Sequence, residues 1–328
     1  MIQATDVDRI LEYACRAPSV HNTQPWTWRV GEDRVDLFAD YRRQLVYADP
    51  QRRDLMISCG AALHHFQVAA RALGYTARVR RVPRSGDERL LASMHLTAAT
   101  PPQDAAALLE AISQRRTDRR RLTSWPVPGE RLEALVGAGS QWGAQVLSLR
   151  GEALRDRLLA LTRRADELQQ RNWNYVQELN SWTTYWNDEG VPVSHVPRDG
   201  RVTATDVLNR RFRNGVLDDP VFEDEPAGDG LLLVCTSSDD PLSRIRAGEA
   251  LSAVWLRASQ DGLSLVPLSQ AVEVPETRRL LQEDVLGDRS VAQILLRVGW
   301  PPLERKPLPA TPRRHVDDVR SFDRRVHG

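Results

Sequence analysis

The sequence predicts an α+β protein built from two copies of one half-unit. Segments with helical hydrophobic spacing alternate with short segments of period two, which is typical of helices alternating with strands. Gly60-Ala61-Ala62-Leu63 matches Gly248-Glu249-Ala250-Leu251 at an offset of 188 residues, and Gly74 matches Gly262 at the same offset. Such a fixed offset indicates an internal repeat.

A second alignment shows where the two copies differ in length. Ala14 aligns with Ala134 at an offset of 120, so the second copy holds 68 additional residues, the difference between the two offsets. We therefore expect a first half at 1–100 and a second half at 101–328, with an insertion at about 163–225 inside the second.

Composition restricts the function classes. The 328 residues include 45 basic and 44 acidic side chains, so a net charge of +1 gives no overall attraction to nucleic acid or an anionic membrane. The three cysteines lie far apart, which predicts neither disulfides nor a thiolate metal site. The N-terminal residues lack a signal-peptide pattern, so we expect a cytoplasmic protein. Its expected partners are small molecules, without nucleic acid, membrane or metal.

The first half begins with a helix and continues with paired strands. Its periodicities predict a helix at 5–16, strands at 27–30 and 34–38, a helix at 54–74, and strands at 76–82 and 90–98. The second helix is apolar on nearly every side, which is typical of a buried helix. Gly74 is a typical residue at its end.

A polar turn links the first helix to the first strand. Pro18 and Pro25 enclose it, because a proline removes a backbone donor and biases the residue before it away from helix. Ser19, Asn22 and Gln24 lie between them and offer hydrogen-bonding groups to a planar polar ligand. The turn is therefore the first candidate binding segment.

The second half has an arginine-rich entry but has lost the polar turn. A predicted helix at 104–113 is followed by the run Arg115-Arg116-Thr117-Asp118-Arg119-Arg120-Arg121. Guanidinium groups bind phosphate oxygens bidentately, although a solvated surface run is the alternative in so arginine-rich a chain. The alignment at offset 120 places Ser19 on Gly139 and Asn22 on Trp142. A closing strand is predicted at 294–299.

The insertion opens as a helix and then becomes rich in aromatic residues. The large rings are Trp173, Tyr175, Trp182, Tyr185 and Trp186. Two interpretations stay open. Trp173, Trp182, Tyr185 and Trp186 form a lid over a bound ligand, or the segment is an extra helical pair packed on the core.

Ala17-Pro18-Ser19-Val20-His21-Asn22-Thr23-Gln24-Pro25-Trp26 closely resembles the flavin-contacting segment of the FMN-dependent nitroreductase family. Within it, His21-Asn22-Thr23 resembles the tandem-repeat, Acg-like actinobacterial branch. The arginine run and Val127-Pro128-Gly129-Glu130-Arg131-Leu132 resemble further family segments. The resemblance implies the nitroreductase fold, with two mostly antiparallel sheets wrapped by helices and the flavin in the crevice between the halves.

The resemblance also implies which residues bind the cofactor. These are Pro18, Ser19, Asn22 and Gln24 in the turn, Arg115, Arg116, Thr117 and Arg119 in the arginine run, then Pro267, Leu268, Ser269, Arg313 and Arg314. Nitroreductases are normally homodimers that bind flavin between subunits. Here the first half keeps the turn and the second keeps the arginine run. We therefore expect one FMN per chain in an internal pseudodimer, for which a monomer suffices.

The implied activity is NAD(P)H-dependent reduction of nitro, quinone or enone compounds by ping-pong hydride transfer at flavin N5. The flavin carries the chemistry, so no catalytic side chain is expected, while Arg119 and Ser269 support the ring. The alternative is an Acg-like FMN-storage protein in which the lid closes the flavin and little reductase activity remains. A degenerate stress protein without flavin is a third alternative.

Overall fold

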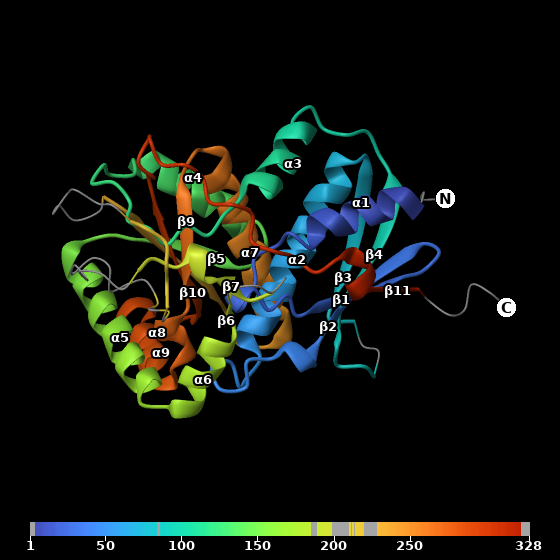
Figure 1. Cartoon of the computed structure of the whole chain (residues 1–328). Coiled ribbons are helices and arrows are strands. Elements are labelled where there is room, and N and C mark those ends of the chain that lie inside the picture. The colour runs from blue at the N-terminus through green and yellow to red at the C-terminus, as the bar shows by residue number, and fades with distance from the viewer. Residues whose placement is uncertain are drawn as a thin grey trace.

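The computed structural model describes residues 4–83, 86–184, 189–198, 210, 212, 214–219 and 228–322. Its strands form two main sheets, which lie on either side of two long central helices (Figure 1). The α+β class expected from the sequence is confirmed. The family resemblance implied two mostly antiparallel sheets, and the order and direction of the strands agree with this expectation.

The first sheet combines the N-terminal strands with one strand from the C-terminus. Its members are β1 (Trp26–Val30), β2 (Arg34–Ala39), β3 (Tyr75–Arg81), β4 (Leu90–Ala98) and β11 (Arg320–Phe322). They lie in the order β11-β1-β2-β4-β3. The pairs among β1 to β4 are antiparallel, and β11 runs parallel to β1.

The second sheet repeats this order. Its strands are β5 (Gln145–Leu149), β8 (Gly230–Thr236), β9 (Ser264–Leu268) and β10 (Val291–Gly299), arranged as β5-β8-β10-β9 with every pair antiparallel. In both sheets the strand that is third along the chain lies at the edge, beside the fourth. The strand expected at 294–299 is the last part of β10.

The two central helices have the spacing that the glycine match predicts. Helix α2 (Arg53–Ala72) and helix α7 (Pro241–Gln260) each span 20 residues, and their first residues are 188 positions apart. A Cβ atom placed on Gly60 would lie 3.0 Å from the Cα of Gly248. The two helices therefore approach closely where these glycines meet.

The helices that precede the two sheets differ in length. Helix α1 (Ala4–Ala14) ends before Pro18, whereas helix α4 (Gly129–Ser140) continues six residues past Ala134. The alignment places Pro18 on Ala138, which keeps its backbone donor, so the helix is not interrupted there. Only four residues then separate α4 from β5, so this connection is much shorter than the polar turn between α1 and β1.

Segments of the second half also complete the first. Helix α3 (Ala105–Gln114) packs on both α2 and α7. After β10 the chain returns to the first sheet, where helix α10 (Val316–Val319) contacts α1 and β1 and leads into β11. In Figure 1 both described ends of the chain lie beside the first sheet.

The helix at 152–170, which begins before the expected insertion and ends within it, covers the outer side of the second sheet. Helix α5 (Glu152–Gln170) packs on helices α8 (Gln270–Glu273) and α9 (Pro275–Leu281), which continues into a π-helical turn (Gln282–Leu286). Helix α6 (Trp173–Ser181) follows, with the short paired strands β6 (Thr183–Thr184) and β7 (Val191–Pro192). Tyr175, Val176 and Leu179 of α6 pack against Leu45 and Ala48.

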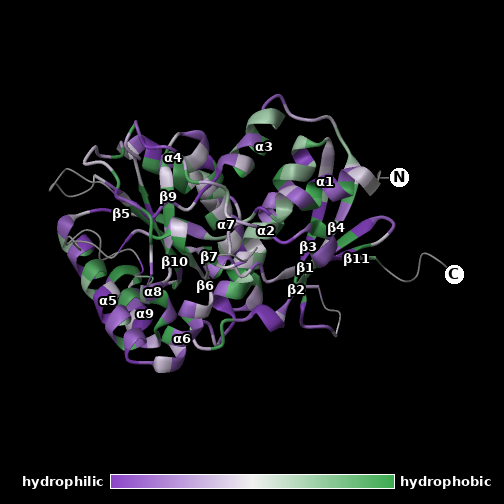
Figure 2. Cartoon of the chain, in the orientation of Figure 1, coloured by the Kyte–Doolittle hydropathy of each residue, from purple (hydrophilic) through white to green (hydrophobic). Residues whose placement is uncertain are grey.

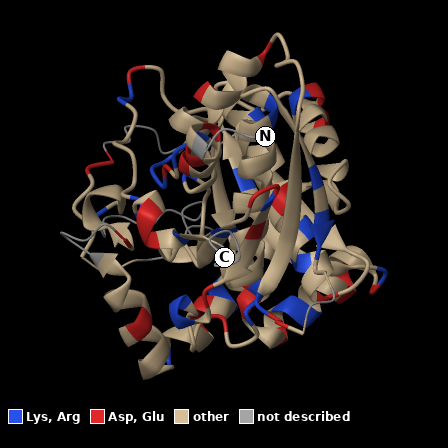
Figure 3. Cartoon of the chain, turned by 90° about the vertical axis from the view of Figure 1, so that its right-hand side faces the viewer, with Lys and Arg blue, Asp and Glu red and all other residues tan. Residues whose placement is uncertain are grey.

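Hydrophobic residues gather between the sheets and the central helices, whereas outer helices such as α5 carry both hydrophobic and hydrophilic residues (Figure 2). Basic and acidic residues are interspersed along the ribbon in the view of Figure 3. Among the described helices, none is long and apolar enough to cross a membrane.

Candidate functional site

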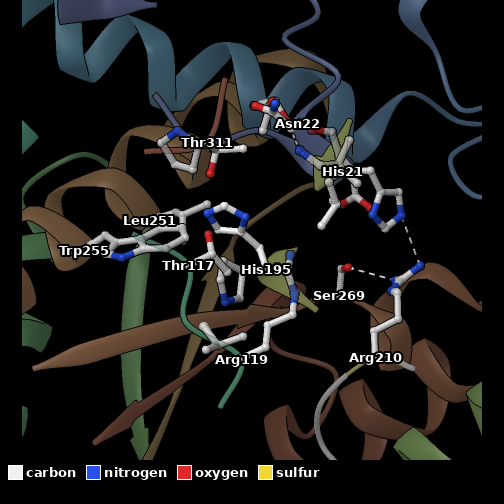
Figure 4. Close-up of a pocket in the computed structure, with 18 of the residues that line it drawn as sticks. His21, Asn22, Thr117, Arg119, His195, Arg210, Leu251, Trp255, Ser269 and Thr311 are labelled. Carbon is white, nitrogen blue, oxygen red and sulfur yellow. Dashed lines mark hydrogen bonds between the residues drawn. The ribbon is translucent and has the colours of Figure 1, made fainter. Parts of the chain in front are cut away.

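A cavity lies where the two halves meet, beside α2 and α7 (Figure 4). Its walls come from the polar turn, both central helices, the arginine run, β9, β10, the insertion and the C-terminal segment. The lining residues are Pro18, Ser19, Val20, His21, Asn22, Asp54, Ile57, Ser58, Arg115, Thr117, Arg119, Val191, Pro192, His195, Arg210, Phe212, Leu251, Trp255, Val266, Pro267, Ser269, Ile294, Thr311 and Arg313.

The polar turn has an unusual backbone conformation. His21, Asn22 and Gln24 have φ angles of 45°, 56° and 49°, in the left-handed region that non-glycine residues rarely adopt. The backbone N–H of Gln24 donates to the Ser19 hydroxyl at 3.0 Å, which helps to hold this conformation. Strained residues of this kind concentrate at binding sites. The two prolines predicted a turn of fixed shape, but nothing in the sequence predicted the left-handed backbone conformation of these three residues.

Asn22 connects the turn to two distant segments. Its Nδ2 donates to the carbonyl oxygens of Gly190 and Pro312, each at 3.0 Å, and its Oδ1 accepts from Arg313 at 2.9 Å. One side chain of the first half thus binds both the insertion and the C-terminal segment. These contacts bring Arg313 to the wall of the cavity.

Two buried guanidinium groups lie at this end of the cavity. Arg115 is 5% exposed and stacks on the Trp255 ring, 4.5 Å from its centroid. Its Nε and Nη1, and the Nε of Arg313, have no hydrogen-bond partner among the described residues. Burial holds the pKa of Arg115 well below its usual range, and the charge of Arg313 lowers it further. Burial lowers the pKa of Arg313 to about 10. Buried donors without partners indicate an anion site.

A second group of side chains lies opposite the turn. Arg119 stands over the Phe212 ring at 5.0 Å, and burial lowers its pKa to about 10. The Nε2 of His195 donates to the carbonyl oxygen of Pro309 at 3.0 Å, and burial lowers the pKa of this imidazole. Thr117 lies beside them in Figure 4. This wall therefore carries a cation and a neutral imidazole.

Arg210 of the insertion connects the residues of a third wall of the cavity. It donates to the Tyr175 hydroxyl at 2.6 Å and to the Ser269 hydroxyl at 3.1 Å, and it forms a buried ion pair with Glu273. Its Nη1 lies 3.3 Å from the Nε2 of His21, which must accept because arginine only donates. Burial and the charge of Arg210 keep the pKa of His21 well below its usual range. Figure 4 draws the contacts of Arg210 with His21 and Ser269.

The cavity gathers nine of the thirteen residues that the resemblance implied. These are Pro18, Ser19, Asn22, Arg115, Thr117, Arg119, Pro267, Ser269 and Arg313. The contact of these residues with FMN stays a prediction. His21 lies in the predicted turn, where contact with a ligand and a structural hydrogen bond were both open interpretations. Asp54, His195, Arg210 and Phe212 were not predicted, since such isolated residues carry no positional signal in the sequence.

The other four implied residues lie outside the cavity wall. Gln24 is fully buried, and its Oε1 accepts from the backbone N–H of Arg314 at 2.8 Å. Arg116 donates to the carbonyl oxygens of Ser113 and Leu308, and Leu268 lies in an apolar cluster with Val266 and Leu295. Their positions stabilise the segments that carry the neighbouring cavity residues.

The aromatic residues of the insertion are placed differently from the lid interpretation. Trp173 is 71% exposed, and Trp182 packs under the guanidinium of Arg43 at 5.5 Å, so neither ring lines the cavity. Tyr185 and Trp186 lie outside the described residues. The insertion does reach the cavity, through Val191, Pro192 and three residues already described, so it is more than a helical pair on the core.

The chain is similar in sequence and in fold to known proteins. No family model matches the chain. It is 39% identical over 96% of its length to "Putative NAD(P)H nitroreductase Rv3131" of Mycobacterium tuberculosis, covering 91% of that protein. It is 33% identical over 97% of its length to "Putative NAD(P)H nitroreductase acg" of the same organism, covering 96%. A putative nitroreductase from Anabaena variabilis shares the fold, with a TM-score of 0.57 and 9% identity over 90% of this chain and 88% of that one.

Proposed function

Because the chain belongs to the nitroreductase family, we propose that it is a flavoprotein that binds one FMN and uses NAD(P)H to reduce small nitro, quinone or enone compounds. When bound, FMN would supply the redox chemistry, that is, two-electron transfer from NAD(P)H to the acceptor by way of its N5 in a ping-pong cycle. The protein would supply position, charge and exclusion of water.

The buried, unpartnered donors of Arg115 and Arg313 are the observation that carries this proposal. A phosphate monoester is close to dianionic at neutral pH and accepts several charge-assisted hydrogen bonds. Both guanidinium groups match such a group, and the hydroxyls of Ser19 and Thr117 line the same cavity. A water molecule would leave the two neighbouring cations without a counter-charge.

The remaining walls suit a flat ring with one polar edge. Leu251, Val266 and Ile294 offer apolar surface, which is the usual lining of a cofactor site. Arg119 would stabilise negative charge on the ring, because a preorganised buried cation is effective in a site without water. With a pKa of about 10, it remains charged at neutral pH. The hydroxyl of Ser269 would lie at the polar edge.

One FMN per chain is supported by the residues found at the counterpart of the candidate site, the position that corresponds to it in the internal repeat. The offset of 188 pairs Arg81 with Ser269 and Gln67 with Trp255. Arg81 and Gln67 both donate to the fully buried Glu249, at 2.7 Å in each case. Trp142, aligned with Asn22, packs against the His64 ring at 4.4 Å. Side chains of the protein thus take the place of a second cofactor.

The experiment is an absorption spectrum of the purified protein, followed by anaerobic mixing with NADPH or NADH. We expect a yellow protein, or a colourless one that binds added FMN, and loss of the flavin absorbance at a rate that supports turnover with a quinone. A protein that FMN cannot turn yellow would refute the proposal as a whole.

FMN storage is the second candidate, favoured by the contacts of Arg210. This residue fastens the insertion to Ser269 and Glu273 across one wall of the cavity, which would limit the approach of nicotinamide to the ring. In that case the oxidised spectrum would persist for hours after NADPH is added, although FMN is tightly bound. The same mixing experiment therefore separates the two functions.

A further inference from the structure

Asp54 stands between two cavities. It is the second residue of α2 and lines the candidate site described above. It also lines a second cavity of about 390 Å³, which lies among the start of α2, helix α6 and helices α8 and α9. A side chain that borders both spaces can pass a proton from one to the other.

The carboxyl group of Asp54 is buried and incompletely paired. The residue is 5% exposed, and its Oδ1 has no hydrogen-bond partner among the described residues. Burial raises its pKa well above the usual range, and the carboxylates of Asp49 and Glu273 raise it further, whereas Arg53 and Arg210 lower it. Other titratable or charged side chains also line the two cavities: His21, Arg115, Arg119, His195 and Arg313 in the first, and Tyr175, Arg278 and Arg279 in the second. These surroundings favour the protonated form of the carboxyl group.

Asp49 offers a route by which this proton is replaced. Its carboxylate accepts the backbone N–H of Arg53 at 2.7 Å and that of Leu55 at 2.8 Å, so it is fixed beside the start of α2. It lines the second cavity only. Burial raises its pKa to about 6, so it takes up and releases protons near neutral pH.

The other polar groups on the site wall are poorer proton donors. The lowered pKa values of Arg119 and Arg313 are still about 10, so both guanidinium groups hold their protons at neutral pH. His21 and His195 are neutral imidazoles, and the Nε2 atoms are engaged with Arg210 and with the carbonyl oxygen of Pro309. Hydroxyl groups are weaker acids than a carboxyl group.

We propose that Asp54 is the acid that protonates the electron acceptor, and that the second cavity returns the proton from solvent through Asp49. The inference rests on the proposed reductase function. For a quinone the balance is quinone + NAD(P)H + H⁺ giving hydroquinone + NAD(P)⁺. The hydride equivalent comes from NAD(P)H by way of FMN. The O–H bond of the Asp54 carboxyl breaks as the second hydroquinone O–H forms, and the resulting carboxylate is protonated again from the second cavity.

The first test is independent of turnover. Infrared spectra of the FMN-loaded wild type should contain the carbonyl stretching band of a protonated carboxyl group, and Asp54→Asn should lose part of it. Asp166→Asn is the matched control, because Asp166 lies nearby on α5 and lines neither cavity. An unchanged band in Asp54→Asn would overturn the proposal, because the carboxyl would then be ionised.

The second test compares a quinone, which needs protons, with ferricyanide, which does not. We expect Asp54→Asn to lower the quinone turnover about 100-fold, within the range of general acid catalysis, and to leave ferricyanide turnover within two-fold. Asp54→Glu should restore most of the quinone rate. An equal loss with both acceptors would refute the role of Asp54. Failure of the wild type with both acceptors would instead refute the reductase function on which the inference rests.

A third measurement uses only the wild type, in case Asp54→Asn does not fold. The quinone rate should fall as the pH rises through the pKa of the carboxyl group, because only the protonated form donates. The ferricyanide rate should lack this loss. Parallel pH profiles for the two acceptors would contradict the proposal.

Discussion

Gly60 of α2 and Gly248 of α7 lie against each other at the centre of the molecule, and each occupies the position of the other in the repeat. A Cβ on Gly60 would clash with the carbonyl oxygen of Ile245, and one on Gly248 would lie 2.8 Å from the Cα of Gly60. The candidate site lies beside this crossing, since Ile57 and Leu251 line it from the two helices. The separation of α2 and α7 therefore determines the width of the cavity.

Gly60→Ala and Gly248→Ala should each destabilise the protein by about 1–3 kcal/mol, because a methyl group against backbone atoms forces the helices apart. Urea denaturation gives the free energy of unfolding. Gly137→Ala on the exposed side of α4 is the matched control, since nothing lies within 4 Å of the added atom. That change should stabilise the protein by about 0.5–1 kcal/mol. Equal effects at all three positions would show that the close approach is unimportant.

Arg115→Met and Arg313→Met should each weaken FMN binding by roughly 1.5–3 kcal/mol, the value of one hydrogen bond to a charged group. Arg116→Met and Arg314→Met are the controls from the same two segments, because those side chains lie outside the cavity wall. Quenching of FMN fluorescence during titration measures all four dissociation constants. A larger loss in the control pair would place the phosphate at the outer arginines instead.

Arg210→Met should destabilise the protein by about 3–5 kcal/mol, because it leaves the buried carboxylate of Glu273 without its cation. The double change Arg210→Met with Glu273→Leu should recover much of this loss, since neither charge then remains buried alone. Denaturant unfolding of the two single variants and the double variant completes the cycle. Additive losses would mean that the two side chains do not depend on each other.

Stability should fall as the pH is lowered below about 6.5. Burial lowers the pKa of His64 to about 3, so the native state stays neutral there while the unfolded chain binds a proton. The contribution is complete above pH 6.5 and declines towards pH 3, at about 1.4 kcal/mol for each pH unit. His64→Gln should reduce the slope of unfolding free energy against pH by one proton. An unchanged slope would mean that His64 is protonated in the folded protein.

The sequence predicted the structure best where a local pattern of a few residues determined the conformation. The glycine match at offset 188 predicted the relation between α2 and α7, because only glycine permits their close approach. The apolar run at 61–73 predicted a buried helix, and Gly74, with a φ of +86°, ends the segment. Six of the nine cavity residues lie in the contiguous motifs of the turn and the arginine run, whereas Pro267, Ser269 and Arg313 were implied by the family resemblance alone.

The remaining site residues depend on tertiary contacts that no local pattern encodes. Arg210 is one of many arginines, and it matters because folding places it beside Glu273 and Ser269. Asp54 resembles any acid at a helix start until the second cavity is seen. The aromatic residues of the insertion predicted a lid by composition alone, yet Trp173 faces solvent because α6 turns Tyr175 and Leu179 inward.

The central claim is that both halves of the chain hold one FMN between them, and calorimetric titration of the purified chain with FMN tests it most directly. We expect one FMN per chain for the wild type, with binding weakened by Asn22→Ala in the first half and by Arg115→Met in the second. A stoichiometry of two FMN per chain, or an FMN dissociation constant that is unchanged by either substitution, would contradict the account.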